Sequence, residues 1–125
     1  MDMADELRQV WEIKLEDEAV KFDQDKPRMD LIPPQAILEV GKAMGFGSRK
    51  YNGWNYLNGS GLKHSQVMRA ALTHLYQHQY GEDLDSESSL SHLSHAAASI
   101  LMLLELTKVH PENDDRFEGY KKKVC

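Results

Sequence analysis

Histidines are concentrated in one stretch of the sequence, residues 73–105, which contains four of the six in the chain. His74 and His78 are four residues apart, and His92 and His95 are three residues apart. On a helix, either spacing places both side chains on one face. Imidazole nitrogens held in this way can bind a divalent cation, although histidines also lie on polar helix faces without any ligand.

An acidic loop, residues 81–87, separates the two histidine pairs. Gly81 suits the end of the first helix, and Ser86 or Ser88 can cap the second. Helices joined by so short a link are expected to be antiparallel neighbours. The loop carboxylates and the histidines would then meet at one end of a helical bundle.

This arrangement predicts a divalent-metal site. Glu82, Asp85 and Glu87 are the candidate catalytic carboxylates, and Glu87 can orient or deprotonate a bound water. The alternative is that the histidines and carboxylates are surface groups. We expect the metal ligands to come from the following residues, with His78 a weaker member: His74, Glu82, Asp85, His92 and His95.

Two cations, Lys26 and Arg28, flank Pro27 in a proline-broken segment that cannot form a continuous helix. The proline restricts the backbone, which favours holding both cations toward a phosphate. The alternative is local pairing with the aspartates of the same segment: Asp23, Asp25 and Asp30.

Cations, aromatics and asparagines are mixed in residues 46–56, which have a loop-like composition. Such a mixture can stack a base, hydrogen-bond its edge and neutralise a phosphate. Its glycines do not form a Walker or dinucleotide fingerprint, and an aromatic such as Trp54 can instead plug the end of the bundle. Lys42 and Arg69 are weaker phosphate candidates. The substrate-binding candidates in this stretch are Arg49, Lys50, Tyr51, Asn52, Trp54 and Asn55.

Composition indicates one domain with its own core, since the chain has 125 residues. Its net charge of -5 argues against a general nucleic-acid binder. Cys125 is the single cysteine, which excludes an internal disulfide and a cysteine metal cage.

We expect no export and no membrane association. The N-terminal residues have no signal-peptide pattern, and the longest apolar run, residues 96–104, is far below the roughly 20 residues that span a bilayer.

Apolar periodicity predicts an all-α bundle of about four helices. The first covers Met3 to Val20, where Glu12 and Glu16 are a weak metal-binding pair; the second begins at Pro34 and ends near Gly45 or Gly47. The third is capped by Ser65, and the last ends before Pro111, followed by a charged tail without assigned chemistry. Because Ala96 and Leu103 widen the apolar surface of the last helix, we expect another subunit to cover part of it. Its predicted core stripe is Leu90, Leu93, Ala97, Ile100, Leu101 and Leu104.

The motifs KPRMDLIPPQAI, FGSRKYNGWN and RAALTHLYQHQYGEDLDSESSLSHLSHAAASILMLLE together resemble the phage dATP/dGTP diphosphohydrolase N-terminal domain family, a relative of the MazG-like all-α nucleoside triphosphate pyrophosphohydrolases. The similarity covers about residues 21–105. The usual MazG carboxylate signature is not present in its ordinary form; at its helical place the chain has His74 to Glu82 and His92 to His95, and Glu82 and Asp85 supply the one ExxD spacing there. Ser89 and Ser99 stand where the family tends to carry glycine and asparagine.

The resemblance implies a helical bundle that oligomerises, binds Mg²⁺ or Mn²⁺ and releases pyrophosphate from dGTP or dATP. It also extends to a phage deoxynucleoside monophosphate kinase that lacks a P-loop, so phosphate transfer to a nucleotide is the second candidate function. A non-catalytic nucleotide-binding or host-inhibiting protein is the third. For a phage-encoded protein we expect the host cytoplasm as its location.

Overall fold

The computed structural model describes residues 2–5 and 18–122, and the chain divides into two units, Met1–Leu31 and Ile32–Cys125. The first unit contains a short 3-10 helix, η1 (Met29–Leu31). The predicted helix from Met3 to Val20 lies mostly outside the described residues, as do Glu12 and Glu16. Its predicted end is wrong, because Glu18 to Val20 are not helical.

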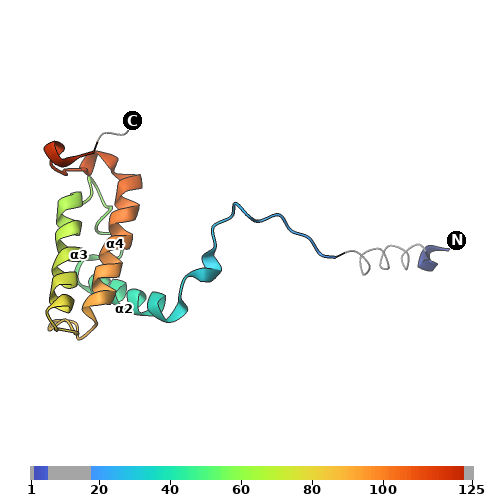
Figure 1. Ribbon diagram of the computed structural model, residues 1–125, viewed down its shortest axis with the longest axis horizontal. Helices are drawn as coiled ribbons and strands as arrows, with labels where there is room; N and C mark the ends of the chain where they lie inside the picture. Colours follow the sequence, from blue (N-terminus) through green and yellow to red (C-terminus); the bar gives the residue numbers. More distant parts are fainter. Residues whose placement is uncertain (1, 6–17, 123–125) are drawn as a thin grey trace. The chain divides into compact units, whose positions relative to one another are not determined.

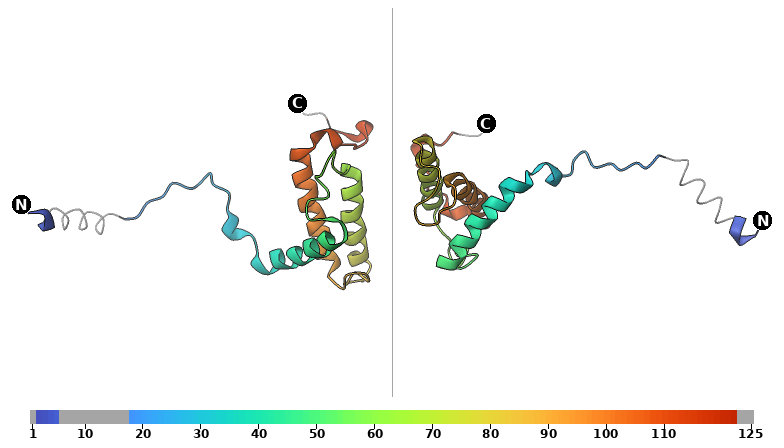
Figure 2. Two further views of the ribbon diagram at one scale, coloured as in Figure 1. Left: turned by 180° about the vertical axis from the view of Figure 1, so that it is seen from behind. Right: turned by 90° about the horizontal axis from the view of Figure 1, so that it is seen from below.

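The second unit is built from three α-helices, α2 (Pro34–Tyr51), α3 (His64–Gln79) and α4 (His92–Val109), followed by the 3-10 helices η2 (Pro111–Asn113) and η3 (Glu118–Tyr120). Helices α3 and α4 lie side by side, and α2 packs against α4 near the loop that joins the pair (Figures 1 and 2). The described residues contain no strand, and Leu84 and Ser91 form an isolated bridge. The predicted all-α class is confirmed. None of the helices in the described residues is long and apolar enough to cross a bilayer.

Helix α2 begins at Pro34 as predicted, but it does not end at Gly45 or Gly47. It continues to Tyr51. Glycine inside a helix lowers stability by only about 1 kcal/mol relative to alanine, and packing of Val40 and Ala43 against Ala98 of α4 outweighs that preference. Residues 46–51 therefore project from a helix and not from a loop.

The end of α3 follows the prediction. Gly81 has φ +95°, and the N–H groups of Gly81 and Glu82 donate to the carbonyls of His78 and Gln77, each over 3.0 Å. This pair of bonds is a Schellman motif, in which glycine adopts the left-handed conformation without strain.

The predicted N-terminal caps of α3 and α4 are wrong. Helix α3 begins at His64, one residue before Ser65, and Gln66 Oε1 accepts from the Lys63 N–H over 2.9 Å. Helix α4 is capped by Ser91, whose hydroxyl oxygen accepts from the Ser94 N–H over 3.0 Å. Serine alone does not identify a cap, because its hydroxyl also bonds other groups.

The buried face of α4 also differs from the predicted stripe. Small and polar side chains are buried, among them His92, Ala96 and Ser99. Four members of the predicted stripe, Leu93, Ile100, Leu101 and Leu104, keep 43–59% of their surface exposed. Small residues let neighbouring helices approach closely, so within one chain the leucine-rich side faces outward.

The C-terminal segment is packed onto the loop before α3, although the sequence indicated only a charged tail. Asn113 is buried and its amide donates to the carbonyls of Ser60 and Leu62 over 2.6 and 2.9 Å. His110 Nε2 lies 2.8 Å from the Leu57 carbonyl oxygen. The segment therefore fixes the loop that connects α2 to α3.

We expect Asn113→Ala to lower the free energy of unfolding by about 2 kcal/mol, because it leaves two carbonyls without their donor. Chemical denaturation of the purified chain measures the difference. Asn58→Ala, which changes an exposed asparagine of the same loop, is the matched control and should change stability by less than about 0.5 kcal/mol. Equal effects of the two substitutions would contradict a clamping role for Asn113.

Candidate functional site

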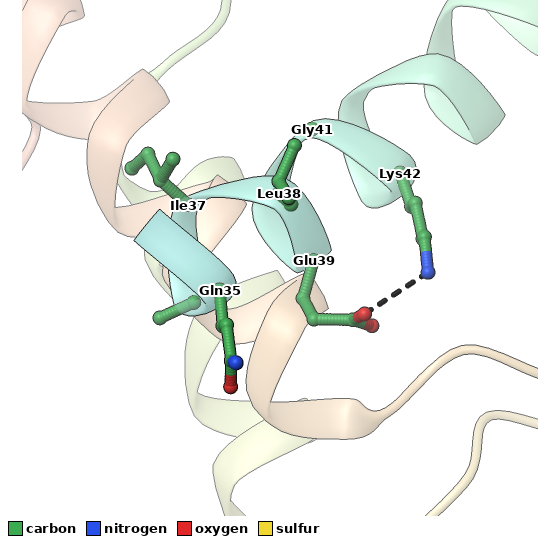
Figure 3. Close-up of a pocket in the computed structure, with 7 residues that line it drawn as sticks. Gln35, Ile37, Leu38, Glu39, Gly41 and Lys42 are labelled. Carbon is green, nitrogen blue, oxygen red and sulfur yellow. Dashed lines mark hydrogen bonds and ion pairs between the residues drawn. The ribbon is translucent and has the colours of Figure 1, made fainter. Parts of the chain in front are cut away.

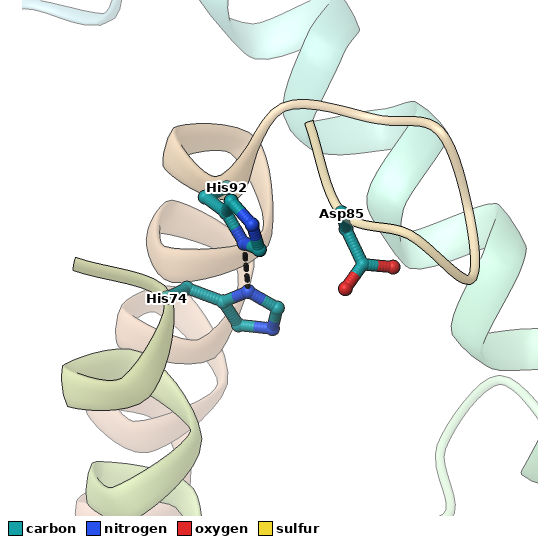
Figure 4. Close-up of side chains that lie close together, drawn as sticks. All are labelled: His74, Asp85 and His92. Carbon is teal, nitrogen blue, oxygen red and sulfur yellow. Dashed lines mark hydrogen bonds between the residues drawn. The ribbon is translucent and has the colours of Figure 1, made fainter. Parts of the chain in front are cut away.

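Three of the predicted histidines and one aspartate meet where the loop between α3 and α4 folds back on α2. His74 comes from the second half of α3, His92 and His95 come from the first turns of α4, and Asp85 comes from the loop. Donor atoms of His74, Asp85 and His92 lie within 4.8 Å of one another (Figure 4). The prediction that the loop brings the two helices' histidines together is confirmed for these residues.

His92 is fully buried and bonded through both ring nitrogens. Its Nδ1 lies 2.8 Å from Nδ1 of His74, and its Nε2 lies 2.9 Å from Oε2 of Glu82. Burial of an imidazole requires partners for both nitrogens, and here the partners come from α3 and from the loop. His92 thus links His74 of α3 to Glu82 of the loop.

His95 packs between α3 and α2. Its ring stacks on His74 with centroids 4.8 Å apart and planes at 15°, and the edge of Phe46 meets it at 5.9 Å and 82°. Its Nε2 lies 2.6 Å from the hydroxyl of Ser88. The helical extension of α2 places Phe46 here.

The loop is held in shape by its own backbone. Asp85 Oδ2 accepts from the N–H groups of Ser88 and Glu87 over 2.8 and 3.2 Å, and the Asp85 N–H donates to the Leu90 carbonyl over 2.8 Å. Ser89 has φ +61°. This left-handed conformation is easiest for glycine, so the serine at this position adopts an uncommon backbone conformation.

Burial shifts the titration of the site. The pKa of His74 is lowered from 6.5 by burial and by the neighbouring His95 and His92, and the pKa of His95 is also lowered by burial. Burial alone would raise the pKa of Asp85, but hydrogen bonds from Ser88 and the charges of His95 and His74 outweigh it and lower the pKa. At neutral pH the ionised Asp85 carboxylate therefore lies beside His74 and His95 in their neutral form.

A cavity of about 540 Å³ opens beside this cluster. It is bounded by α2, α3, α4, the acidic loop and residues 52–62. Several predicted site residues line it, and so do Gln66 and Ser99, which sequence reasoning missed. Ser99 is four residues after His95 on the same face of α4, and that spacing was the available signal. The predicted residues that line the cavity are Lys50, Tyr51, Asn52, Asn55, His74, Asp85, Glu87 and His95.

Lys50 links α2 to the loop through an ion pair with Glu87 of 2.9 Å. Its ammonium lies 5.3 Å from the Tyr51 ring centroid and 5.8 Å from that of Phe46. The hydrogen bond with Glu87 raises the pKa of Lys50. A fixed cation therefore stands at the cavity, with an exposed carboxylate as its counter-ion.

Other predicted residues lie apart from the cavity. Trp54 is 65% exposed and its ring tilts against Tyr56. Arg49 is exposed, 6.0 Å from the Phe46 ring centroid. His78 is also exposed and is not among the cavity-lining residues described.

Lys26 and Arg28 belong to the other unit of the chain. The Arg28 guanidinium forms two bonds with the Asp30 carboxylate, of 3.0 and 2.8 Å. For Arg28 the structure therefore contains the local pairing that was the alternative to phosphate binding.

A separate hollow of about 690 Å³ lies on the first turns of α2 (Figure 3). All its lining residues belong to this helix, and Lys42 is paired with Glu39 over 3.0 Å. No histidine lines it. It is a stretch of exposed helix surface and lacks the chemistry of the first cavity.

The fold and the site define an all-helical domain whose histidines and carboxylates converge on one cavity. The chain belongs to the family described as dATP/dGTP diphosphohydrolase, N-terminal, whose profile matches residues 16–116. It is similar to a dATP/dGTP diphosphohydrolase of Salmonella phage PMBT28, with 33% identity over 97 residues, which cover 78% of this chain and 32% of that relative. The chain thus spans about a third of the relative's length. No solved structure matches it.

We expect His74 and His95 to titrate below 6.5 and His110 above it. His110 differs because the Leu57 carbonyl and Glu112 raise its pKa. NMR titration of the imidazole protons, compared with the urea-unfolded chain, measures all three values.

The lowered pKa values of His74 and His95 and the raised pKa of His110 make stability depend on pH in opposite directions. Below pH 6.5 the unfolded chain binds more protons at His74 and His95, so their contribution to the free energy of unfolding decreases as the pH falls. The contribution of His110 is present below 6.5 and is lost as the pH rises through its folded pKa. Identical titration midpoints for the folded and unfolded chain would contradict the geometry.

Proposed function

We propose that the cavity beside His74 and Asp85 binds a purine deoxynucleoside triphosphate and that the chain hydrolyses it to the monophosphate and pyrophosphate with a divalent metal ion. One observation carries the proposal: a carboxylate, neutral imidazoles and a fixed cation line the same cavity. The family description and the name of the phage relative support a purine deoxynucleotide.

The donor set fits a divalent metal. Asp85 and His74 supply oxygen and nitrogen donors that lie within 4.8 Å of each other, and Glu82, His92 and His95 lie beside them. Imidazole suits transition metals and carboxylate suits Mg²⁺ and Mn²⁺, so this mixed set favours Mn²⁺ over Mg²⁺. The ion would neutralise phosphate charge and lower the pKa of the attacking water.

Lys50 and Glu87 suit the handling of the phosphates and the proton. A phosphate oxygen replaces Glu87 at the Lys50 ammonium, which frees the Glu87 carboxylate to accept a proton from water. The water oxygen then bonds to the α-phosphorus. The bond from that phosphorus to the bridging oxygen breaks, and pyrophosphate leaves. Arg49 is the additional phosphate candidate from the sequence within the same unit.

The base would lie against the part of the cavity formed by α2 and the following loop. Tyr51, Asn52 and Asn55 line this part, so a ring for stacking and two amides for hydrogen bonds are close together. A cavity of about 540 Å³ is in the range of small-ligand sites. Tyr51 lines the cavity and Trp54 does not, which favours Tyr51 as the stacking residue, and the amides would discriminate between bases.

Hydrolysis should be measured by incubating the chain with each deoxynucleoside triphosphate and Mn²⁺ or Mg²⁺ and separating the products. We expect pyrophosphate from dATP or dGTP. Asp85→Asn should reduce the rate by at least about 100-fold, because it removes a charged ligand. Asp83→Asn is the matched control, since Asp83 is an exposed aspartate of the same loop and its change should keep the rate within about twofold.

Two results would contradict the proposal. The first is transfer of phosphate to an added deoxynucleoside monophosphate without pyrophosphate, which is the kinase reaction. The second is nucleotide binding without turnover under either metal, which would indicate a binding protein.

We also propose that a second copy of the chain covers the leucine-rich side of α4. Leu93, Ile100, Leu101 and Leu104 are 43–59% exposed there, and an apolar patch of this kind commonly marks an interface. Coverage from outside would explain why α4 is apolar on nearly all sides.

Sedimentation at micromolar concentration should therefore give a dimer or larger assembly. Leu101→Glu should shift the chain to monomers, because a charge buried in an apolar interface is strongly unfavourable. Lys108→Glu is the control on the exposed end of the same helix and should leave the assembly unchanged. A monomeric parent chain would refute the assembly.

A further inference from the structure

A chain of hydrogen bonds runs from Glu82 through His92 to His74. The distances are 2.9 Å from Glu82 Oε2 to His92 Nε2 and 2.8 Å from His92 Nδ1 to His74 Nδ1. His92 is 0% exposed, so in this structure its two ring nitrogens depend on these two partners. His92 is the middle residue of these two hydrogen bonds and must satisfy both at once.

The carboxylate sets the direction of both bonds. An ionised carboxylate can only accept, so the proton between Glu82 and His92 is on Nε2 of His92. In a neutral imidazole the other nitrogen is then an acceptor. With His92 neutral, its Nδ1 is the acceptor, and Nδ1 of His74 is the atom that carries the proton and donates.

The consequence for His74 is a lone pair on Nε2. His74 and Asp85 both line the cavity, and the Asp85 carboxylate is turned toward the His74 ring (Figure 4). His92, by contrast, has no free lone pair, since one nitrogen donates to Glu82 and the other accepts from His74. Proximity alone suggested three donors, but the hydrogen bonds leave only two of them available.

We propose that His92 is a positioning residue that holds His74 in the tautomer with its lone pair on Nε2, so that His74 Nε2 and Asp85 bind the metal ion and His92 does not. The inference rests on the proposed metal-dependent function. In metal sites a ligand histidine commonly gives its other N–H to a carboxylate, which fixes its tautomer and strengthens it as a ligand. Here His92 stands between the ligand histidine and the carboxylate of Glu82.

The tautomers can be read directly by ¹⁵N NMR of the metal-free, histidine-labelled chain at neutral pH. We expect the proton of His74 on Nδ1 and the proton of His92 on Nε2. Glu82→Ala removes the acceptor, and because Glu82 is 52% exposed the fold should tolerate the change. The His74 proton should then be shared between its two nitrogens, whereas Asp83→Ala, the matched control, should leave it on Nδ1. The opposite tautomers, or no response to Glu82→Ala, would overturn the inference.

Binding of Mn²⁺, measured by calorimetry without nucleotide, gives a second readout. In His92→Gln the side-chain oxygen can accept from His74 while the amide donates to Glu82, so we expect affinity within about threefold of the parent. His92→Leu fills similar space without either bond and should weaken binding by about 10- to 100-fold. Equal losses for the two variants would identify His92 as a direct ligand and would overturn the inference.

These measurements separate the inference from the proposed function. Neither one requires nucleotide or turnover. The expected tautomers without any hydrolysis would reject the function alone, and hydrolysis with the opposite tautomers would reject the inference alone.

Discussion

The buried contact between His92 and His74 is the constraint on which the rest of the site depends. A fully buried imidazole needs a partner at each nitrogen, and these partners come from α3 and from the loop, at 2.8 and 2.9 Å. The Schellman turn at Gly81 and the Ser91 cap bring the two ends of the loop to the positions that this contact requires. If either end shifted, a buried polar group would lose its partner, so the loop has one favoured conformation.

That conformation connects all three α-helices of the second unit. The loop presents Asp85 and Ser88 to the histidines and Glu87 to Lys50 of α2. Phe46 and Lys50 reach the site because α2 continues past its glycines. The cavity is therefore a product of the packing of α2 on α4, and its chemical groups come from segments that are distant in the sequence.

Helix α4 carries small residues on its buried side and large apolar residues on its exposed side. Ala96, Ala98 and Ser99 allow close packing near the histidines, whereas the exposed leucines form the surface that we propose a second copy covers. His92 and Ser99 are buried by this packing within one chain, which strengthens their polar interactions. The C-terminal segment completes the unit at its other end by bonding the loop before α3.

The sequence by itself determined the all-α class, the paired histidines on two joined helices, the start of α2 at Pro34 and the turn at Gly81. These features depend on periodicity and on local backbone chemistry, which are set by residues close together in the chain. Only the tertiary structure decided the length of α2, the serine that caps α4, the buried side of α4 and the two hydrogen-bond partners of His92. Each of these features depends on which neighbour packs against a residue. For a histidine, its burial and its hydrogen-bond partners determine whether a ring nitrogen is available to a ligand, and the spacing along the sequence does not.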